Sequence, residues 1–107
     1  MSEKTLFERI IDREIPGDFV YEDELCVAIK DINPKAPVHV LVIPRKALRG
    51  ISEAEPEDST LLGHLLLVAQ GLAKQNACKD YRLQINNGEK AGQTVFHLHL
   101  HLLGWPS

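Results

Sequence analysis

The sequence predicts an α+β fold in which a five-stranded antiparallel sheet packs with two helices, and two patterns carry that prediction. Segments with the apolar patterns of strands lie on both sides of one long helical segment, and a shorter helical segment precedes them. The connections between strand segments are too short for the helical crossovers that a parallel sheet requires. The 107 residues, 44% of them hydrophobic and 25% charged, suit one globular domain over residues 1–107.

The first predicted element is a short amphipathic helix that starts after Thr5. Thr5 and Glu8 have the spacing of a capping box, in which each side chain accepts a hydrogen bond from the backbone of the other residue. Pro16 and Gly17 stop the helical pattern. The apolar residues at helical spacing are Leu6, Phe7, Ile10 and Ile11.

A β-hairpin is predicted next, over residues 18–31, with a tight acidic turn at residues 22–24. Its two arms are rich in β-branched and aromatic residues. Two prolines in residues 32–37 break the pattern, and residues 38–45, VHVLVIPR, resume it as a nearly all-apolar strand. Such a strand is expected to be buried on both faces, and His39 lies inside it.

The long helix is predicted over residues 53–76, where apolar residues recur on one stripe. Its start is acidic and its end is basic, as the helix dipole favours. Residues 81–86 are predicted as a strand, residues 87–93 as a glycine-containing loop and residues 94–104 as the final strand. His64, inside the long helix, is expected to be structural or exposed to solvent.

The final strand contains three of the five histidines, His97, His99 and His101, in alternation with apolar residues. Alternate side chains of a strand point to opposite faces, so the three imidazoles would stand in one row. Three interpretations of this row are open: a solvated polar face, a metal site, or nucleophilic and acid–base chemistry. The residues expected to face the core instead are Phe96, Leu98, Leu100 and Leu102.

The residues around the histidine row favour chemistry on phosphorus over a metal site. Histidines two positions apart on a strand can share a metal, but the nearest acidic residue, Glu89, lies in the preceding loop and no cysteine is near. A neutral imidazole, with an ordinary pKa of about 6.5, can attack phosphorus without a strong base to activate it. Backbone N–H groups of residues 88–95 would bind the same phosphate. We therefore expect no metal and no cofactor, and activity in the presence of a chelator.

Composition excludes several other classes of protein. The net charge is −3, with 15 acidic and 12 basic residues, and the basic residues do not cluster, which argues against nucleic acid as the partner. No segment reaches the apolar length that spans a membrane, and the N-terminus lacks a continuous apolar stretch. The two isolated cysteines, Cys26 and Cys78, are expected to be free thiols in a reducing compartment, so the sequence predicts a cytoplasmic protein.

Residues 97–103, HLHLHLL, match the His-φ-His-φ-His-φ-φ signature of the histidine triad superfamily, where φ is a hydrophobic residue. The whole chain is similar to the nucleotide-binding branch of that superfamily, from about Thr5 to Gly104. Four separated segments carry the resemblance: IIDREIP at residues 10–16, DINPKAPVHVLVIPR at 31–45, YRLQIN at 81–86 and AGQTVFHLHLHLLG at 91–104.

The resemblance implies a purine nucleoside phosphoramidate hydrolase that acts at the α-phosphate. By position, His99 would be the nucleophile that forms a nucleotidyl-histidine intermediate, and His101 would contact the phosphate oxygens and the leaving group. His97 and His39 would orient this pair, and Asp31 would bind the ribose hydroxyls. The remaining nucleotide-binding positions are Leu6, Phe7, Ile10 and Ile32 beside the purine, and Asn86, Gly92, Gln93, Thr94 and Val95 around the phosphate.

The same resemblance implies a homodimer in which the two sheets are continuous across a two-fold axis, and a purine nucleoside monophosphate or its phosphoramidate as the ligand. Two other functions are compatible with it: hydrolysis of dinucleoside polyphosphates, and nucleotide binding by a protein without enzymatic activity. The chain departs from the family pattern at its end, where Trp105-Pro106-Ser107 follow Gly104 at once. This shorter tail leaves the preference for a leaving group open.

Overall fold

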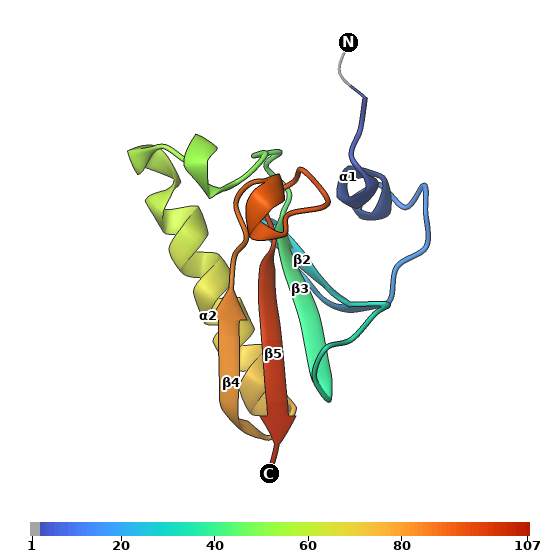
Figure 1. The fold of residues 1–107 in the computed structure, drawn as a ribbon, viewed down its shortest axis with the longest axis vertical. Coiled ribbons are helices and arrows are strands. Elements are labelled where there is room, and N and C mark those ends of the chain that lie inside the picture. Colours follow the sequence, from blue (N-terminus) through green and yellow to red (C-terminus); the bar gives the residue numbers. More distant parts are fainter. Residues whose placement is uncertain (1–2) are drawn as a thin grey trace.

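The computed structural model describes residues 3–107 and contains one five-stranded sheet with the order β1-β2-β3-β5-β4 (Figure 1). Each neighbouring pair of strands is antiparallel, so the predicted α+β architecture is confirmed. The elements are α1 (Leu6–Ile11), β1 (Phe19–Glu22), β2 (Cys26–Lys30), β3 (Val38–Pro44), α2 (Ser59–Gln75), β4 (Cys78–Gln84) and β5 (Leu100–Pro106). In the described part of the chain, no helix is long and apolar enough to span a membrane.

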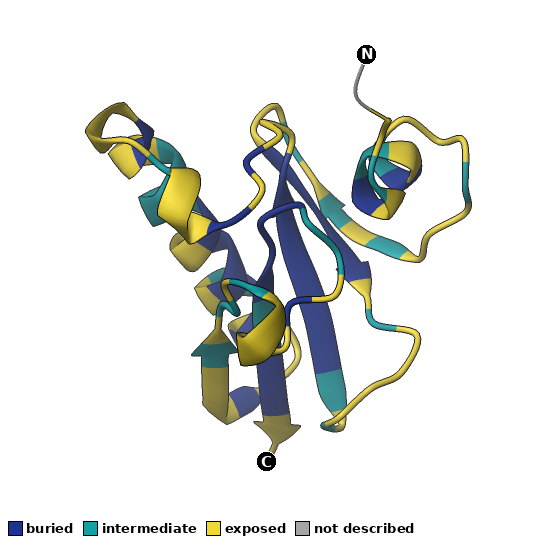
Figure 2. Ribbon diagram, turned by 45° about the horizontal axis from the view of Figure 1, so that its top comes forward, coloured by how far each residue is buried: buried dark blue, intermediate teal, exposed yellow. Residues whose placement is uncertain are grey.

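The two helices pack on opposite faces of the sheet, each over its own hydrophobic cluster (Figure 1). Helix α2 covers the larger cluster, to which β2, β3 and β5 contribute alternate residues. Helix α1 covers a smaller cluster through Phe7 and Ile10, which pack on the other alternate residues of β2 and β3. Both faces of β3 are therefore covered, and Figure 2 shows the central strands buried, with exposed residues along β4. This confirms the prediction for residues 38–45.

Helix α1 has the predicted capping box but ends earlier than expected. The Thr5 side chain accepts a hydrogen bond from Glu8 N–H at 3.2 Å, and the Glu8 carboxylate accepts one from Thr5 N–H at 3.0 Å. The helix ends at Ile11 because Arg13 adopts the left-handed conformation, with φ of 63°. Glu14 N–H then donates to the carbonyl of Arg9, the long hydrogen bond of a Schellman motif. Glycine usually occupies the left-handed position, so an arginine there gives no signal in the sequence.

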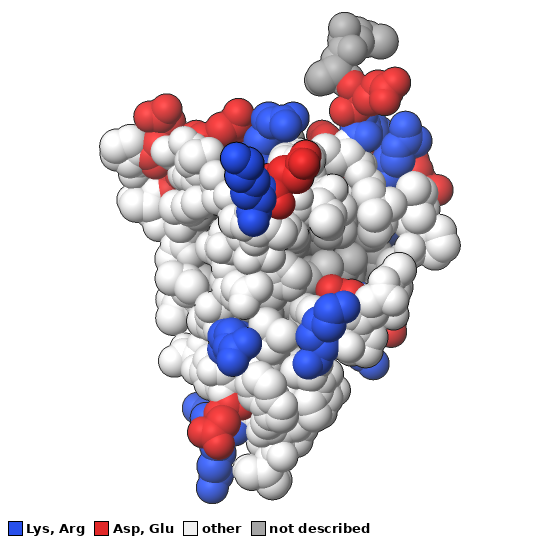
Figure 3. Space-filling model, in the orientation of Figure 1, with Lys and Arg blue, Asp and Glu red and all other residues white. Residues whose placement is uncertain are grey.

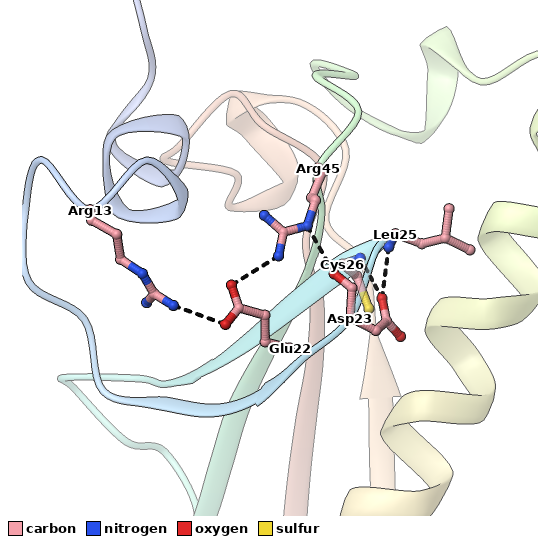
Figure 4. A network of polar contacts seen from close by, with 6 residues as sticks. All are labelled: Arg13, Glu22, Asp23, Leu25, Cys26 and Arg45. Carbon is pink, nitrogen blue, oxygen red and sulfur yellow. Dashed lines mark hydrogen bonds and ion pairs between the residues drawn. The ribbon is translucent and has the colours of Figure 1, made fainter.

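Arg13 also starts a chain of polar contacts that connects the end of α1 to the hairpin and to the end of β3 (Figure 4). Its guanidinium lies 3.6 Å from the centroid of the Phe19 ring and donates to Glu22 at 2.9 Å. Glu22 also accepts from Arg45 at 2.9 Å, and Arg45 Nε donates to the Asp23 carbonyl at 2.9 Å. Exposed ion pairs contribute less than about 1 kcal/mol each, so this chain orients α1 more than it stabilises the fold.

Helix α2 is shorter at its start than the prediction of residues 53–76. Two single 3-10 turns, Ile51–Glu53 and Pro56–Asp58, precede it, and the α-helix begins at Ser59. Pro56 lacks an N–H and opens the second turn, while Asp58 accepts a hydrogen bond from Glu55 N–H at 2.9 Å. Strand β4 begins at Cys78, three positions before the predicted strand, because the chain reverses at Ala77 in the left-handed conformation, with φ of 57°.

The final strand is also shorter than predicted, and this corrects the expected histidine row. Strand β5 begins at Leu100, so of the three histidines only His101 belongs to it. Strand β3 ends at Pro44, which has no N–H to continue the ladder, and the Pro44 carbonyl accepts a hydrogen bond from the His97 ring at 2.7 Å. The alternation of side chains persists without the ladder. Leu98, Leu100 and Leu102 pack toward α2, while Phe96 is only partly buried and lies outside both clusters.

His64 has a structural partner, because it closes a partly buried polar cluster between α2 and the hairpin turn. Its Nε2 lies 2.6 Å from a carboxylate oxygen of Asp23, and that oxygen also accepts from the Tyr21 hydroxyl at 2.7 Å. The other carboxylate oxygen accepts from the backbone N–H groups of Leu25 and Cys26, both at 2.8 Å. Burial alone would raise the pKa of Asp23, but these four donors outweigh it and hold that pKa well below the ordinary value of 3.8.

We predict that Asp23→Ala lowers the free energy of unfolding by about 1–2 kcal/mol, since it removes the shared acceptor of four donors, three of them partly buried. Urea denaturation measures the change, and Glu24→Ala in the same exposed turn is the matched control, expected to lie within about 0.5 kcal/mol of the wild type. The folded pKa of Asp23 is depressed, so its contribution is complete above pH 4 and is lost as the pH falls further. An equal effect of both variants would contradict the role of Asp23.

Candidate active site

Four imidazoles meet on the face of the sheet that α1 partly covers. His39 comes from β3 and His101 from β5, and their Nε2 and Nδ1 atoms lie 3.0 Å apart. The ring centroid of His99 lies 4.9 Å from that of His101. The Phe7 ring of α1 meets His99 edge-on at 4.8 Å. Although only His101 of the three C-terminal histidines is in a regular strand, the structure brings together the histidines that the sequence singled out.

His97 is the most deeply buried histidine of the cluster, with 1% of its surface exposed. Its Nε2 lies 2.7 Å from the Pro44 carbonyl oxygen, which can only accept, so the neutral ring carries its proton on Nε2. His97 therefore makes its contribution through the backbone: its own carbonyl oxygen lies 2.7 Å from Nδ1 of His99. The ring fixes the chain at this point, and the carbonyl orients the next histidine.

His99 has the features of a nucleophile. Because the His97 carbonyl can only accept, the proton of the neutral His99 ring is on Nδ1, and Nε2 keeps a lone pair. Burial lowers the pKa of His99 from its ordinary value of 6.5, an effect that the hydrogen bond to His97 only partly offsets. At neutral pH the ring is therefore uncharged, and its lone pair is available to attack an electrophile.

A chain of hydrogen bonds fixes the proton of His101 as well. The backbone N–H of Lys35 donates to Nδ1 of His39 at 3.0 Å, so neutral His39 carries its proton on Nε2. That proton points to Nδ1 of His101, which must accept it, so the proton of His101 is on Nε2. Burial, followed by the charges that His99 and His39 would carry, lowers the pKa of His101 to about 4. His101 is thus a neutral donor.

The donor of His101 has no partner within the protein. Among residues 3–107, the two buried ring nitrogens without a hydrogen bond are Nε2 of His101 and Nδ1 of His97. A buried donor without an acceptor is costly, and such groups mark sites that bind a ligand or water. An oxygen of a bound phosphate would satisfy it.

A cavity of about 410 Å³ adjoins His101 and His39, between the end of β4, the loop before β5 and the loop from β2 to β3. Four further predicted positions line it: Asp31, Asn86, Gly92 and Thr94. Other lining residues carry no signal in the sequence, namely Asn33, Lys35, Gln84 and Leu103. Strand periodicity predicts which residues share a face, but it does not predict that Gln84 pairs with His101 across β4 and β5, which brings it into the site.

The other predicted nucleotide-binding residues do not line this cavity. Phe7 and Ile10 belong to the core under α1, while Leu6 and Ile32 are exposed, Ile32 by 91%. Gln93 is buried, and its amide group braces the loop by donating to the carbonyls of Arg49 and Val95 and accepting from Gly88 N–H. Val95 packs against the smaller cluster. The structure thus separates a cavity lined by the expected phosphate and ribose residues from the apolar positions near α1.

Two clusters in the described chain have donor atoms close enough to share a metal ion. The donor atoms of Asp31, His39 and His101 lie within 4.8 Å of one another, as do those of Asp23, Cys26 and His64. In the first cluster, His39 and His101 are hydrogen-bonded to each other, so a metal would have to displace the proton between them. In the second, the carboxylate of Asp23 already accepts four hydrogen bonds, and burial raises the pKa of the Cys26 thiol to about 12.

The antiparallel sheet places several imidazoles beside a glycine-containing loop. This combination is typical of a class of small proteins with a histidine-lined site. Residues 4–107 match the family model described as scavenger mRNA decapping enzyme C-term binding. An uncharacterized HIT-like protein of Synechocystis is 59% identical over 112 residues, covering 99% of this chain and 98% of its own. The chain therefore belongs to the HIT-like, or histidine triad, family.

Two further relatives extend the comparison. The crystal structure of a HIT family hydrolase from Legionella pneumophila superposes with a TM-score of 0.93 at 40% identity, covering 97% of this chain and 95% of that one. A 14 kDa zinc-binding protein of Zea mays is 47% identical over 110 residues, covering 95% of this chain and 86% of its own. The agreement in fold is close over nearly the whole length.

We predict that nuclear magnetic resonance of the ring nitrogens at pH 7 finds His99 and His101 neutral, with the proton on Nδ1 in His99 and on Nε2 in His101. On acidification, His101 should not become charged until about pH 4. Because this folded pKa lies below the ordinary 6.5, stability should decline as the pH falls from 6.5 toward 4. A charged His101 ring at pH 6 would contradict the hydrogen-bond chain.

Proposed function

We propose that this protein hydrolyses purine nucleoside phosphoramidates at the α-phosphorus through a nucleotidyl intermediate on His99. One observation carries the proposal: the lone pair of His99 Nε2 and the unpartnered N–H of His101 belong to adjacent rings whose centroids are 4.9 Å apart. The first supplies a nucleophile and the second a donor for the phosphoryl oxygens, where negative charge is concentrated in the transition state. The Legionella pneumophila relative is named as a hydrolase, which supports the class of reaction.

In the proposed first step, the lone pair of His99 Nε2 forms a bond to phosphorus while the P–N bond breaks. The nitrogen leaves with the bonding electrons and takes a proton from water, so it departs as an amine. In the second step a water molecule attacks phosphorus, the P–His99 bond breaks, and the water gives a proton to solvent. His101 donates a hydrogen bond to a phosphoryl oxygen in both steps and keeps its proton: burial above all lowers its pKa and keeps the ring neutral, and His39 fixes the proton on Nε2.

The remaining assignments follow the cavity. Asp31, with one oxygen bound to Asn33 N–H at 2.8 Å, is proposed to accept hydrogen bonds from the ribose hydroxyls. Asn86, Gly92 and Thr94 are proposed to contact the phosphate. The exposed apolar side chains of Leu6 and Ile32 are proposed to flank the purine, with Phe7 and Ile10 holding α1 in place beneath them.

We also propose a homodimer formed at the exposed edge strand β4, whose central residues are solvent-exposed and whose edge would otherwise remain unpaired. Leu66 of α2 and Tyr81 of β4 are large apolar residues exposed on this side of the molecule. Pairing of two β4 strands would continue the sheet and cover them. The molecular mass in solution tests this arrangement.

The free thiols of Cys26 and Cys78 suit the reducing cytoplasm, which we propose as the location of the protein.

Metal binding is the second candidate function, because the donor atoms of Asp31, His39 and His101 are close together and the Zea mays relative is named as a zinc-binding protein. Hydrolysis of dinucleoside polyphosphates is a third candidate, and nucleotide binding without catalysis is a fourth. These functions differ in the substrate that is turned over and in the effect of a chelator.

We predict that adenosine 5′-monophosphoramidate is hydrolysed faster than a diadenosine polyphosphate, and at the same rate with and without EDTA, since the lone pair of a neutral imidazole needs no metal. Release of adenosine monophosphate measures both rates. A preference for the polyphosphate would support the rival substrate class. Stoichiometric zinc, with activity lost on chelation, would favour the metal site.

We predict that His99→Asn loses turnover by at least about 10⁴-fold, because it removes the nucleophile, while it still binds adenosine monophosphate. Single-turnover assays measure the first effect and calorimetry the second. His64→Gln replaces a histidine outside the cluster and serves as the matched control for turnover. Near-normal hydrolysis by His99→Asn would end the assignment of His99.

A further inference from the structure

The cavity beside His101 extends beyond the residues that the proposed reaction uses. Gln84 lies directly opposite His101 in the pairing of β4 with β5, and Leu103 is the next residue of β5 on the same face. Lys35 reaches the cavity from the loop between β2 and β3. These three residues form a wall and a floor on the side away from α1, which we call the distal pocket.

The reaction geometry decides what the distal pocket would hold, and this step rests on the proposed function. In a displacement at phosphorus, the attacking atom and the leaving atom lie on opposite sides. His99 is the ring that contacts Phe7 of α1, while His101 lines the cavity. Attack by His99 therefore directs the leaving group past His101, toward Gln84, Lys35 and Leu103.

The charge in the distal pocket selects among leaving groups. Of the described residues that line the cavity, Lys35 is the one lysine or arginine, and no ion pair among residues 3–107 includes it. The acid that lines the same cavity, Asp31, accepts from Asn33 N–H and lies 3.4 Å from His39, and the proposed function assigns its remaining acceptor capacity to the ribose hydroxyls. Figure 3 shows basic side chains on both sides of a mostly uncharged strip along β5.

The neighbouring amides carry no charge, and they are paired with each other. Gln84 Nε2 donates to Asn86 at 3.1 Å, so these two amides are held together at the wall. Leu103 is buried and supplies an apolar floor. A leaving group with a short apolar stem and an anionic end would pack on Leu103 and meet Lys35.

We infer that the distal pocket recognises leaving groups that carry an anion close to the departing atom, and that the Lys35 side chain is the specificity-determining group. Two sources share this chemistry: the carboxylate of an amino acid bound to phosphorus through its amine, and the phosphate chain of a dinucleoside polyphosphate. The backbone N–H of Lys35 serves His39, so one residue contributes to both the tautomer of the catalytic pair and the choice of substrate.

The test compares two isosteric substrates, the phosphoramidates of adenosine monophosphate with glycine and with glycinamide. The ratio of their kcat/KM values is measured in the wild type, in Lys35→Gln and in Arg82→Gln. Lys35→Gln keeps the backbone N–H and should lower the glycine-to-glycinamide ratio by about tenfold, the size of one charge-assisted hydrogen bond. Arg82 is exposed on β4 opposite Leu103 but does not line the cavity, so Arg82→Gln should leave the ratio as it is.

A third substrate, diadenosine triphosphate, separates the two sources of the anion. In Lys35→Gln, kcat/KM for diadenosine triphosphate could fall relative to that for the glycinamide compound while the glycine-to-glycinamide ratio stays unchanged. That result would assign the pocket to a phosphate chain. Ratios that are the same in the wild type and Lys35→Gln for both anions would overturn the inference. If no substrate turns over, the proposed function fails. The inference about the distal pocket is then tested by binding alone, through the ratio of the affinities for the glycine and glycinamide compounds. The same ratio in the wild type and in Lys35→Gln would overturn that inference as well.

Discussion

The hydrogen bond between the ring of His97 and the carbonyl of Pro44 determines the geometry on which the site depends. At 2.7 Å, it occupies the acceptor that a continuing β5 strand would need, and so it ends the ladder between β3 and β5. The chain before Leu100 is then free of strand pairing. That freedom lets the His97 carbonyl bond to the ring two residues later, where it sets the proton of His99 on Nδ1. A regular strand would have pointed this carbonyl at a neighbouring strand instead.

The sequence predicts side-chain direction well here, and it predicts the hydrogen-bond ladder poorly. Leu98 and Leu100 face α2 and the histidines face the other side because an extended chain alternates its side chains whether or not it pairs. The end of the ladder depends on Pro44, more than 50 positions away, and no local pattern records that contact. The early end of α1 has a similar cause, since Arg13 takes a conformation that glycine usually signals.

Residues whose roles depend on backbone groups cannot be predicted from sequence patterns for the same reason. In the sequence Lys35 is a loop position between two prolines, yet its N–H sets the tautomers of His39 and His101. The family resemblance implies that Gln93 contacts the phosphate, whereas in the structure three hydrogen bonds to the backbone hold its amide inside the loop. Both residues act through partners that only the folded chain brings near. The histidines themselves are predictable because their pattern is local and chemically unusual.

The protein contains two clusters of an acid with histidines or a thiol, and they differ in whether every donor and acceptor has a partner. Around Asp23, every carboxylate oxygen has donors, the thiol of Cys26 stays protonated, and the result is a clamp between α2 and the hairpin. Around His101, the hydrogen bonds form a directed chain that begins at a backbone N–H and ends at a donor without an acceptor. A complete network stabilises the fold, whereas an open chain leaves one bond for a ligand to make.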